Sequence, residues 1–407
     1  MKKIVLCLGL NVLMLCVSGQ TQAEFNYVLS QINADSLKKT VQDLQHFGNR
    51  YCNNTVDGNR EVAKYLVNRL KNYGINNAKI DSFPVAMEHW LGGTIDRYMY
   101  NVVGRVFGES RLDSTLIIGA HFDAISTTEN RELTAAAPGA EDNASGCAVM
   151  MEIARILHKY NLKTKYNIDF MAYDAEEIGL TGSFYDAEKR KNAEEKIVMM
   201  INNDMVSNQP DTLPWTLNFV WYDNSLHITD KAMQICEAYT VLIPHKPAEN
   251  ENNSTSRASD SYPYYHNGFY ATFASAHTFS PYYHSVNDIA DNCNFEYLKE
   301  VARMNFALLF NYAVADVFDL PTSTEDYIHS VSVFPNPTVN ETKIKFYHGL
   351  QVYKIEIYDI MGRFLDSYSF PFVSNETIID FRSFTNGVYP IRIYTQFGIV
   401  NKKIIKQ

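Results

Sequence analysis

The stretch that decides the fold is NIDFMAYDAEEIGLTGS, residues 167–183. Its first seven residues form a short apolar run with the length and composition of a buried strand. Asp174, Glu176 and Glu177 follow the run directly, and a glycine-bearing turn comes after them. Carboxylates at the end of a buried strand are typical of the ligand-binding edge of an α/β sheet.

Two more apolar runs end in the same way. Residues 115–118 are followed by His121 and Asp123, and residues 198–201 are followed by Asp204. Ligands bind at the carboxyl ends of strands in open parallel sheets. We therefore expect all three strand ends to point into one crevice.

Helical periodicity surrounds these runs. Apolar residues recur at helical spacing in residues 62–73, with Gly74 at the expected end, and again in residues 149–157. Another helix is expected over residues 296–314. Alternating strands and helices predict an α/β domain with a mostly parallel central sheet flanked by helices.

The bulk composition fits a folded soluble protein. Of the 407 residues, 46% are hydrophobic and 20% are charged, and the formal net charge is −10. Phosphate binding requires clustered Lys and Arg. The acidic balance therefore argues against nucleic acid as the main partner.

The N-terminus has the pattern of a secretory signal peptide over residues 1–23. Two lysines precede an apolar run at residues 4–17, and small or polar residues follow. Cleavage after Gly19 and cleavage after Ala23 both remain open. Lipidation at Cys16 is less favoured, because the leucine before it is larger than a lipoprotein cleavage site prefers. The run is too short to span a membrane comfortably, and no later segment is apolar enough to do so.

The chain changes character after residue 318. Residues 319–330 are polar and predict a linker, and residues 331–407 show short alternating runs separated by turn signals. This pattern predicts a small all-β sandwich.

Four cysteines remain after the signal peptide, and no two of them form a CxxC pair. A disulfide between any two of them and buried free thiols both remain open. These are Cys52, Cys147, Cys236 and Cys293.

Metal-type ligands recur along the chain. Each is ambiguous alone, since Asp142 and Asp204 have the pattern of helix caps and His284 that of a surface histidine. Together they give two His, two Asp and one Glu, a set that suits two zinc ions, with manganese or cobalt as alternatives. The expected ligands are His121, Asp142, Glu177, Asp204 and His284. In the tandem pair Glu176-Glu177, adjacent side chains point in different directions, so one can bind metal while the other acts as a general base.

The motifs that carry these residues resemble, in order, those of the co-catalytic zinc exopeptidases. That family includes bacterial leucyl aminopeptidases and glutamate carboxypeptidase II, and the likeness covers about residues 25–318. The motifs are His121-x-Asp, Pro138-Gly-Ala-x-Asp-Asn-x-Ser-Gly, Glu176-Glu-x-Gly-Leu-x-Gly-Ser, Asn203-Asp-Met and Tyr283-His-Ser-x-x-Asp. The resemblance implies a phosphorylase/hydrolase-like fold.

The resemblance also implies a role for each residue. Asp142 bridges two zinc ions; His121 and Asp204 complete one site, and Glu177 and His284 the other. The metals polarise the scissile carbonyl and lower the pKa of a bridging water. Glu176 takes the proton of that water and gives it to the leaving amine, and Asp123 orients His121.

The sequence departs from the family's pattern at one segment. Ser261 stands where the family usually has His, and Ser256 lies at about the position where some members have a tyrosine that stabilises the oxyanion. The oxyanion donor therefore stays open. The nearby candidates are Tyr262, Tyr264, Tyr265, Tyr282 and Tyr283.

The tail resembles the type A sorting domain of the type IX secretion system. The likeness rests on Phe334-Pro-Asn-Pro, Gly362-Arg, Gly387-Val-Tyr and the basic C-terminus. It implies a Bacteroidota-type bacterium, passage through the periplasm, the type IX machinery as partner and a product secreted or held on the outer surface. A carbohydrate-binding or generic β-sandwich module is the alternative.

The leading expectation is an aminopeptidase that acts on peptide substrates, with no membrane span in the mature chain. Three alternatives stay open. A glutaminyl cyclase shares the fold and uses one zinc, a carboxypeptidase or dipeptidase belongs to the same family, and an inactive metal-dependent binding ectodomain would not need the base Glu176.

Overall fold

The computed structural model describes residues 22–53, 58–88, 93–109, 113–314, 331–346, 352–369, 376–395 and 398–407. The chain divides into two compact units, of which one is Leu29–Ala313 and the other contains the C-terminal strands. Most of the predicted signal peptide and the whole predicted linker at residues 319–330 lie outside the described residues. The expected end of the first domain at residue 318 lies outside them as well.

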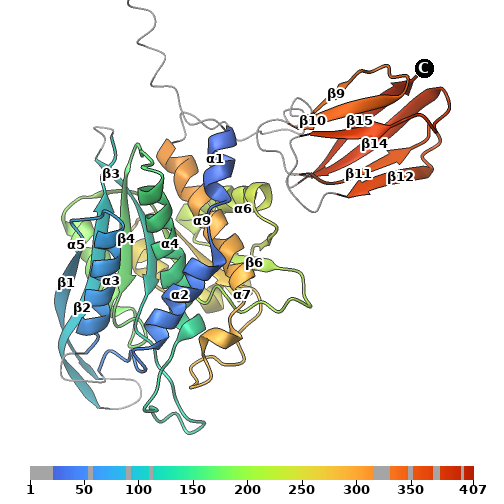
Figure 1. Cartoon of the computed structure of the whole chain (residues 1–407). Coiled ribbons are helices and arrows are strands. Elements are labelled where there is room, and N and C mark those ends of the chain that lie inside the picture. The colour runs from blue at the N-terminus through green and yellow to red at the C-terminus, as the bar shows by residue number, and fades with distance from the viewer. Residues whose placement is uncertain are drawn as a thin grey trace, which may run out of the picture. The chain divides into compact units, whose positions relative to one another are not determined.

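The larger unit is built on an eight-stranded sheet with the order β1-β2-β4-β3-β5-β8-β6-β7 (Figure 1). Its central strands β4, β3, β5 and β8 are parallel neighbours, whereas β1–β2, β2–β4 and β6–β8 pair antiparallel. The strands are β1 Lys79–Glu88, β2 Thr94–Val106, β3 Ser114–His121, β4 Asn167–Tyr173, β5 Lys196–Asn203, β6 Thr216–Val220, β7 Ile243–His245 and β8 Ala271–Ala276. The α/β fold with a parallel centre is confirmed, and the edges add antiparallel strands to it.

The three apolar runs of the sequence form the middle of this sheet. They lie within β3, β4 and β5, and every residue of β4 is buried. Central parallel strands are covered on both faces, which is why their sequences are continuously apolar rather than alternating.

Helices cover both faces of the sheet. Since α4 leads from β3 to β4 and α5 leads back from β4 to β5, right-handed crossovers place these two helices on opposite faces. Figure 1 shows α2, α3 and α4 together on one face. The helices of this unit are α2 Ala34–Gln45, α3 Arg60–Asn72, α4 Ser145–Lys159, α5 Thr181–Asn192, α6 Leu226–Tyr239, α7 Glu249–Thr255, α8 Ser261–His266 and α9 Phe295–Val314. The N-terminal helix α1, Gln22–Leu29, falls in the other unit except for its last residue. The three helices predicted from periodicity correspond to α3, α4 and α9.

The start of α4 lies directly against the end of β5. A Cβ atom on Gly146 would lie 2.1 Å from the backbone oxygen of Asn203, so only glycine allows this approach. The loop before α4, which carries Asp142, is thereby brought to the carboxyl end of the sheet.

The C-terminal unit is all-β, as predicted. A three-stranded sheet, β13-β10-β9, and a four-stranded sheet, β12-β11-β14-β15, share one buried core that includes Ile344, Ile355 and Ile391. The strands are β9 Val331–Phe334, β10 Glu341–Phe346, β11 Val352–Tyr358, β12 Phe364–Ser369, β13 Glu376–Asp380, β14 Gly387–Thr395 and β15 Gly398–Lys406.

The four cysteines left open by the sequence are free thiols. Cys52, Cys147 and Cys236 are buried, and Cys293 is partly buried. Among the described helices, none has the length and apolarity needed to cross a membrane.

Candidate metal centre

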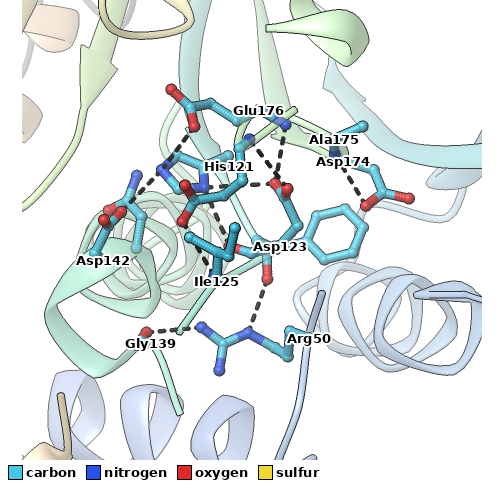
Figure 2. Close-up of polar contacts among 12 residues, drawn as sticks. Arg50, His121, Asp123, Ile125, Gly139, Asp142, Asp174, Ala175 and Glu176 are labelled. Carbon is cyan, nitrogen blue, oxygen red and sulfur yellow. Dashed lines mark hydrogen bonds and ion pairs between the residues drawn. The ribbon is translucent and has the colours of Figure 1, made fainter. Parts of the chain in front are cut away.

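The carboxyl edge of the central sheet brings the predicted ligands together. His121 is the last residue of β3, Asp204 follows β5, and Glu177 follows β4 by four residues. Asp142 precedes α4, and His284 lies on the loop between β8 and α9. Figure 2 shows the side chains of His121, Asp142 and Glu176 converging from these separate elements.

His121 divides its two ring nitrogens between different partners. Its Nε2 lies 3.2 Å from Asp142 Oδ1 and 3.3 Å from Asp204 Oδ1, and 4.0 Å from Glu176 Oε2. Its Nδ1 lies 3.1 Å from the backbone oxygen of Asp123 and 3.5 Å from Asp123 Oδ1. A proton held at Nδ1 by Asp123 leaves Nε2 as the lone-pair donor facing the carboxylates.

Asp142 lies between the two imidazoles. Its Oδ1 faces His121, while its Oδ2 lies 3.3 Å from His284 Nε2. His284 Nε2 also lies 2.9 Å from Glu177 Oε2, yet it makes no hydrogen bond of acceptable geometry within the described chain. A buried nitrogen that faces two carboxylate oxygens without a hydrogen bond has the setting of a metal ligand.

Two triads of donor atoms are close enough to hold an ion. Within each triad, one atom from every residue lies within 4.8 Å of the others. The triads are His121–Glu176–Asp204 and His121–Asp142–Glu177. Imidazole nitrogen with carboxylate oxygen is the donor chemistry of zinc sites, so the residues fit the metal that the sequence predicts.

Asp123 does more than the sequence suggested. Besides facing His121, its Oδ1 accepts a hydrogen bond from the backbone N–H of Glu176 at 3.1 Å, and its Oδ2 accepts one from Glu177 at 3.2 Å. One buried carboxylate therefore fixes both the β3 ligand and the loop that carries the tandem glutamates (Figure 2).

Three residues that sequence reasoning gave no role also hold the centre. Ser259 donates from Oγ to Asp204 Oδ2 at 2.5 Å. Asp288 accepts from the backbone N–H of Asp142 at 3.0 Å and from that of the preceding residue at 2.8 Å. The fully buried Arg50 donates to the backbone oxygens of Phe122 and Gly139, and so ties together the loops that carry His121 and Asp142 (Figure 2).

The electrostatics of the centre reflect crowded, buried carboxylates. Burial raises the pKa of Glu177 to about 7, and the charge of Asp142 adds to this shift. Burial likewise raises the pKa of Glu176 well above its usual range, and the charge of Glu177 adds to that shift. Burial alone would lower the pKa of His121, but the charges of Glu176 and Asp204 raise it well above the usual value. Carboxylates outnumber imidazoles here, so a bound cation would compensate their mutual repulsion.

The loops around the centre contain strained backbone. Ala175, Leu180, Met205 and His284 all have positive φ angles, between 51° and 63°. This left-handed region disfavours residues with a Cβ, and such residues concentrate at functional sites.

A cavity of about 310 Å³ opens beside the ligands. Of the five tyrosines considered as oxyanion donors, Tyr283 lines this cavity, and its ring stacks on His284 with centroids 3.7 Å apart. Tyr264 is instead fully buried and hydrogen-bonded to Tyr173.

Comparison with known families identifies the chain. The model of Peptidase family M28 matches residues 101–309, slightly more than half of the sequence and all of the ligand positions. The chain belongs to Peptidase family M28. Residues 332–407 of this M28 peptidase match the secretion system C-terminal sorting domain. The tail therefore directs the enzyme through type IX secretion to the cell surface or the medium.

Individual relatives agree with the family. A probable leucine aminopeptidase of Arthroderma otae is 26% identical over 299 residues, which cover 71% of this M28 peptidase and 75% of the relative. LapB from Legionella pneumophila has a similar fold, with a TM-score of 0.58 at 23% identity over 72% and 75% of the two chains. Bacteroides thetaiotaomicron glutaminyl cyclase matches with a TM-score of 0.56 at 20% identity, and the match covers 69% of this M28 peptidase and 98% of the cyclase.

Proposed function

We propose that this M28 peptidase is an exported zinc aminopeptidase that removes N-terminal residues from peptides. The observation that carries the proposal is the position of Asp142, whose two oxygens face separate imidazoles, His121 and His284. A carboxylate in this position could be shared by two metal ions. Relatives of the chain are named as a probable leucine aminopeptidase and a probable zinc metalloprotease.

The pairwise distances support the proposed ligand assignment. Asp142 would be shared by two zinc ions, His121 and Asp204 would complete one site, and Glu177 and His284 would complete the other. Zinc, when bound, polarises a peptide carbonyl and lowers the pKa of a bound water.

The remaining chemistry belongs to Glu176. We assign it the role of general base and then general acid, because it lies at the ligand cluster and burial raises its pKa well above the usual value. It accepts a proton from the attacking water and passes that proton to the leaving amine. Asp123 keeps His121 and the backbone of Glu176 in place.

The domain limits are part of the proposal. We assign residues 1–23 to a signal peptide, 25–318 to the peptidase, 319–330 to a linker and 331–407 to the sorting domain. The two family matches, 101–309 and 332–407, fall inside these limits.

A glutaminyl cyclase is the second candidate, because a bacterial enzyme of that activity shares the fold. One-zinc chemistry does not need a carboxylate placed between two imidazoles, which favours the peptidase. A carboxypeptidase or dipeptidase would retain the same metal centre.

One experiment separates these activities. The full chain is loaded with zinc, its metal content is measured, and it is incubated with matched peptides that have free, acetylated or glutaminyl N-termini. Stepwise shortening of free N-termini alone, with two zinc ions per chain and loss of activity on chelation, is the expected result. Loss of ammonia from the glutaminyl peptide without shortening would establish a cyclase instead, and shortening from the C-terminus would establish a carboxypeptidase.

A further inference from the structure

The cavity beside the metal ligands extends onto one face of α7. Glu251 and Thr255 are four residues apart on this helix, and both line the cavity, as does Ala258 three residues later. Residues at this spacing share a helix face. The cavity-facing side of α7 therefore carries Glu251.

The position of this helix is fixed at two points. Asn252, buried beside Glu251, donates from Nδ2 to the backbone oxygen of Trp221 at 2.9 Å and accepts from its backbone N–H at 2.9 Å. At the other end of the segment, Ser259 bonds to the ligand Asp204. With a rise of about 1.5 Å per residue, Glu251 lies roughly 6 Å farther than Thr255 from that anchored end.

The far wall of the cavity favours a cation. Glu251 is exposed at the cavity, and its backbone oxygen accepts from the hydroxyls of Ser254 and Thr255. Within the described parts of the chain its carboxylate has no hydrogen bond or ion pair, so its charge is available to a ligand. Asn218 Oδ1 lies 2.8 Å from His277 Nδ1 and 2.9 Å from His245 Nδ1. Since this oxygen accepts from both rings, the Nε2 of a neutral His277, which lines the cavity, is left as an acceptor.

Apolar side chains form one part of the cavity wall, beside polar residues such as Ser275 and Thr278. Phe273, Ala276 and Phe279 are contributed by β8 and the loop after it, and Met205 by the loop after β5. A wall that combines apolar side chains with a carboxylate suits a long aliphatic stem with a cationic tip.

We propose that Glu251 selects peptides whose N-terminal residue is lysine or arginine. The proposal rests on the proposed aminopeptidase function. The α-amine of such a substrate is adjacent to the scissile carbonyl and therefore stays among the metal ligands. Glu251, on a separate helix, would instead contact the cationic end of the side chain of the N-terminal residue. The apolar residues hold the methylene groups of that side chain.

The test compares lysyl-Ala-Ala with norleucyl-Ala-Ala, since norleucine has the same length as the lysine stem but no charge. The ratio of their kcat/KM values is measured for the full zinc-loaded chain, for Glu251→Gln and for the control Glu249→Gln. Glu249 and Glu251 are both exposed on the same helix, but only Glu251 is among the cavity-lining residues. We expect the ratio to favour lysine, to fall about tenfold in E251Q and to stay unchanged in E249Q, because one charge-assisted contact is lost.

A binding measurement runs in parallel. Calorimetry gives the affinities of lysine amide and norleucine amide for the same three proteins, and we expect the preference for lysine amide to disappear in E251Q alone. Hydrolysis of both peptides with a ratio near one, unchanged in E251Q, would overturn the role of Glu251 and leave the aminopeptidase intact. Failure to shorten either peptide would overturn the aminopeptidase, while the calorimetric preference would still decide whether Glu251 reads a cation.

Discussion

Two buried clusters of charge lie on the same sheet and differ in how their charges are matched. At the metal centre, buried carboxylates outnumber the two imidazoles. Elsewhere, Arg190 donates to Asp169 at 2.8 Å and to Asp186 at 2.6 Å, while Arg105 donates to Asp169 at 2.6 Å. We call this second group, together with Glu195, the Arg190 network.

This difference in charge matching distinguishes a cluster that stabilises the fold from one that binds a ligand. In the Arg190 network, each buried carboxylate is paired with a guanidinium of the chain itself, so the cluster is complete without a ligand. At the metal centre, Asp142 lies between two imidazoles, and crowding with other buried carboxylates raises the pKa values of Glu176 and Glu177. A bound cation would relieve this repulsion. An excess of buried negative charge therefore distinguishes the functional cluster from the structural one.

The largest expected effect is on catalysis. Glu176→Gln removes the proposed base without altering the shape of the side chain, and we expect kcat to fall about 10³- to 10⁴-fold. Zinc content should stay at the wild-type value, because Glu176 is not assigned as a ligand. Glu188→Gln, an exposed carboxylate on α5, is the matched control. A variant that keeps more than a tenth of the wild-type kcat would contradict the assignment.

The next effect is on folding. Arg190→Met leaves Asp186 buried without its guanidinium partner and Asp169 with Arg105 alone, and we expect the free energy of unfolding to fall by about 3–5 kcal/mol. Urea denaturation measures this loss. Lys64→Met removes the exposed pair of Lys64 with Glu61 and should cost less than about 1 kcal/mol. Equal losses of unfolding free energy in the two variants would show that the Arg190 network contributes no more to folding than an exposed ion pair.

A smaller effect concerns metal affinity. Ser259→Ala removes the hydrogen bond to Asp204 Oδ2. Because residues that hydrogen-bond a metal ligand hold it in place, we expect zinc affinity to fall about 10- to 100-fold. Competition with a chromogenic chelator measures the affinity. The control Ser254→Ala removes an exposed hydroxyl and should leave the affinity as it is. An unchanged affinity in S259A would show that Asp204 needs no such support.

The smallest effect belongs to the matched charge of Glu356, a largely buried carboxylate of the C-terminal unit. Hydrogen bonds from Lys354, Tyr358 and Tyr394 lower the pKa of Glu356 to about 2, from 4.5. The unfolded chain then binds the proton at higher pH than the folded chain. The stabilisation by Glu356 is therefore present above pH 4.5 and is lost as the pH falls toward 2.

Carbon-13 NMR of glutamate carboxyls in the full chain, titrated downward from neutral pH, measures this pKa. The resonance that is absent from Glu356→Gln identifies the residue, and it should titrate near pH 2. Titration at the ordinary pH of a glutamate would mean that the three donors do not hold the carboxylate in solution.

Much of the fold could be predicted, because the central elements bury continuous or periodic apolar surfaces. β3, β4, β5 and the helices α3, α4 and α9 appear where periodicity placed them. β1, at the sheet edge, and its neighbour β2 were not predicted, since both are partly exposed and have no continuous apolar run. The two small sheets of the tail followed from alternation and turn signals.

The candidate ligands could be predicted because each follows a recognisable strand or motif. Among their supports, Asp123 was predicted from the family resemblance, but the contacts of Arg50 and Asp288 were not. Arg50 acts by donating to backbone oxygens of residues 72 and 89 positions away, and any sequence provides such oxygens. Asp288 binds backbone N–H groups near residue 142 in the same way. Contacts between a side chain and a distant backbone leave no pattern in spacing or composition, so only the folded chain reveals them.

The left-handed residues beside the ligands have a consequence for local unfolding. The left-handed conformation costs about 1–2 kcal/mol of folding free energy at each of Ala175, Met205 and His284. Without metal, the ligand loops are therefore expected to open more readily than the strands they follow, and their amide hydrogens should exchange first. Bound zinc would join these loops to one another across the sheet edge. Metal occupancy would then determine which part of an enzyme working outside the cell is first exposed to proteolysis.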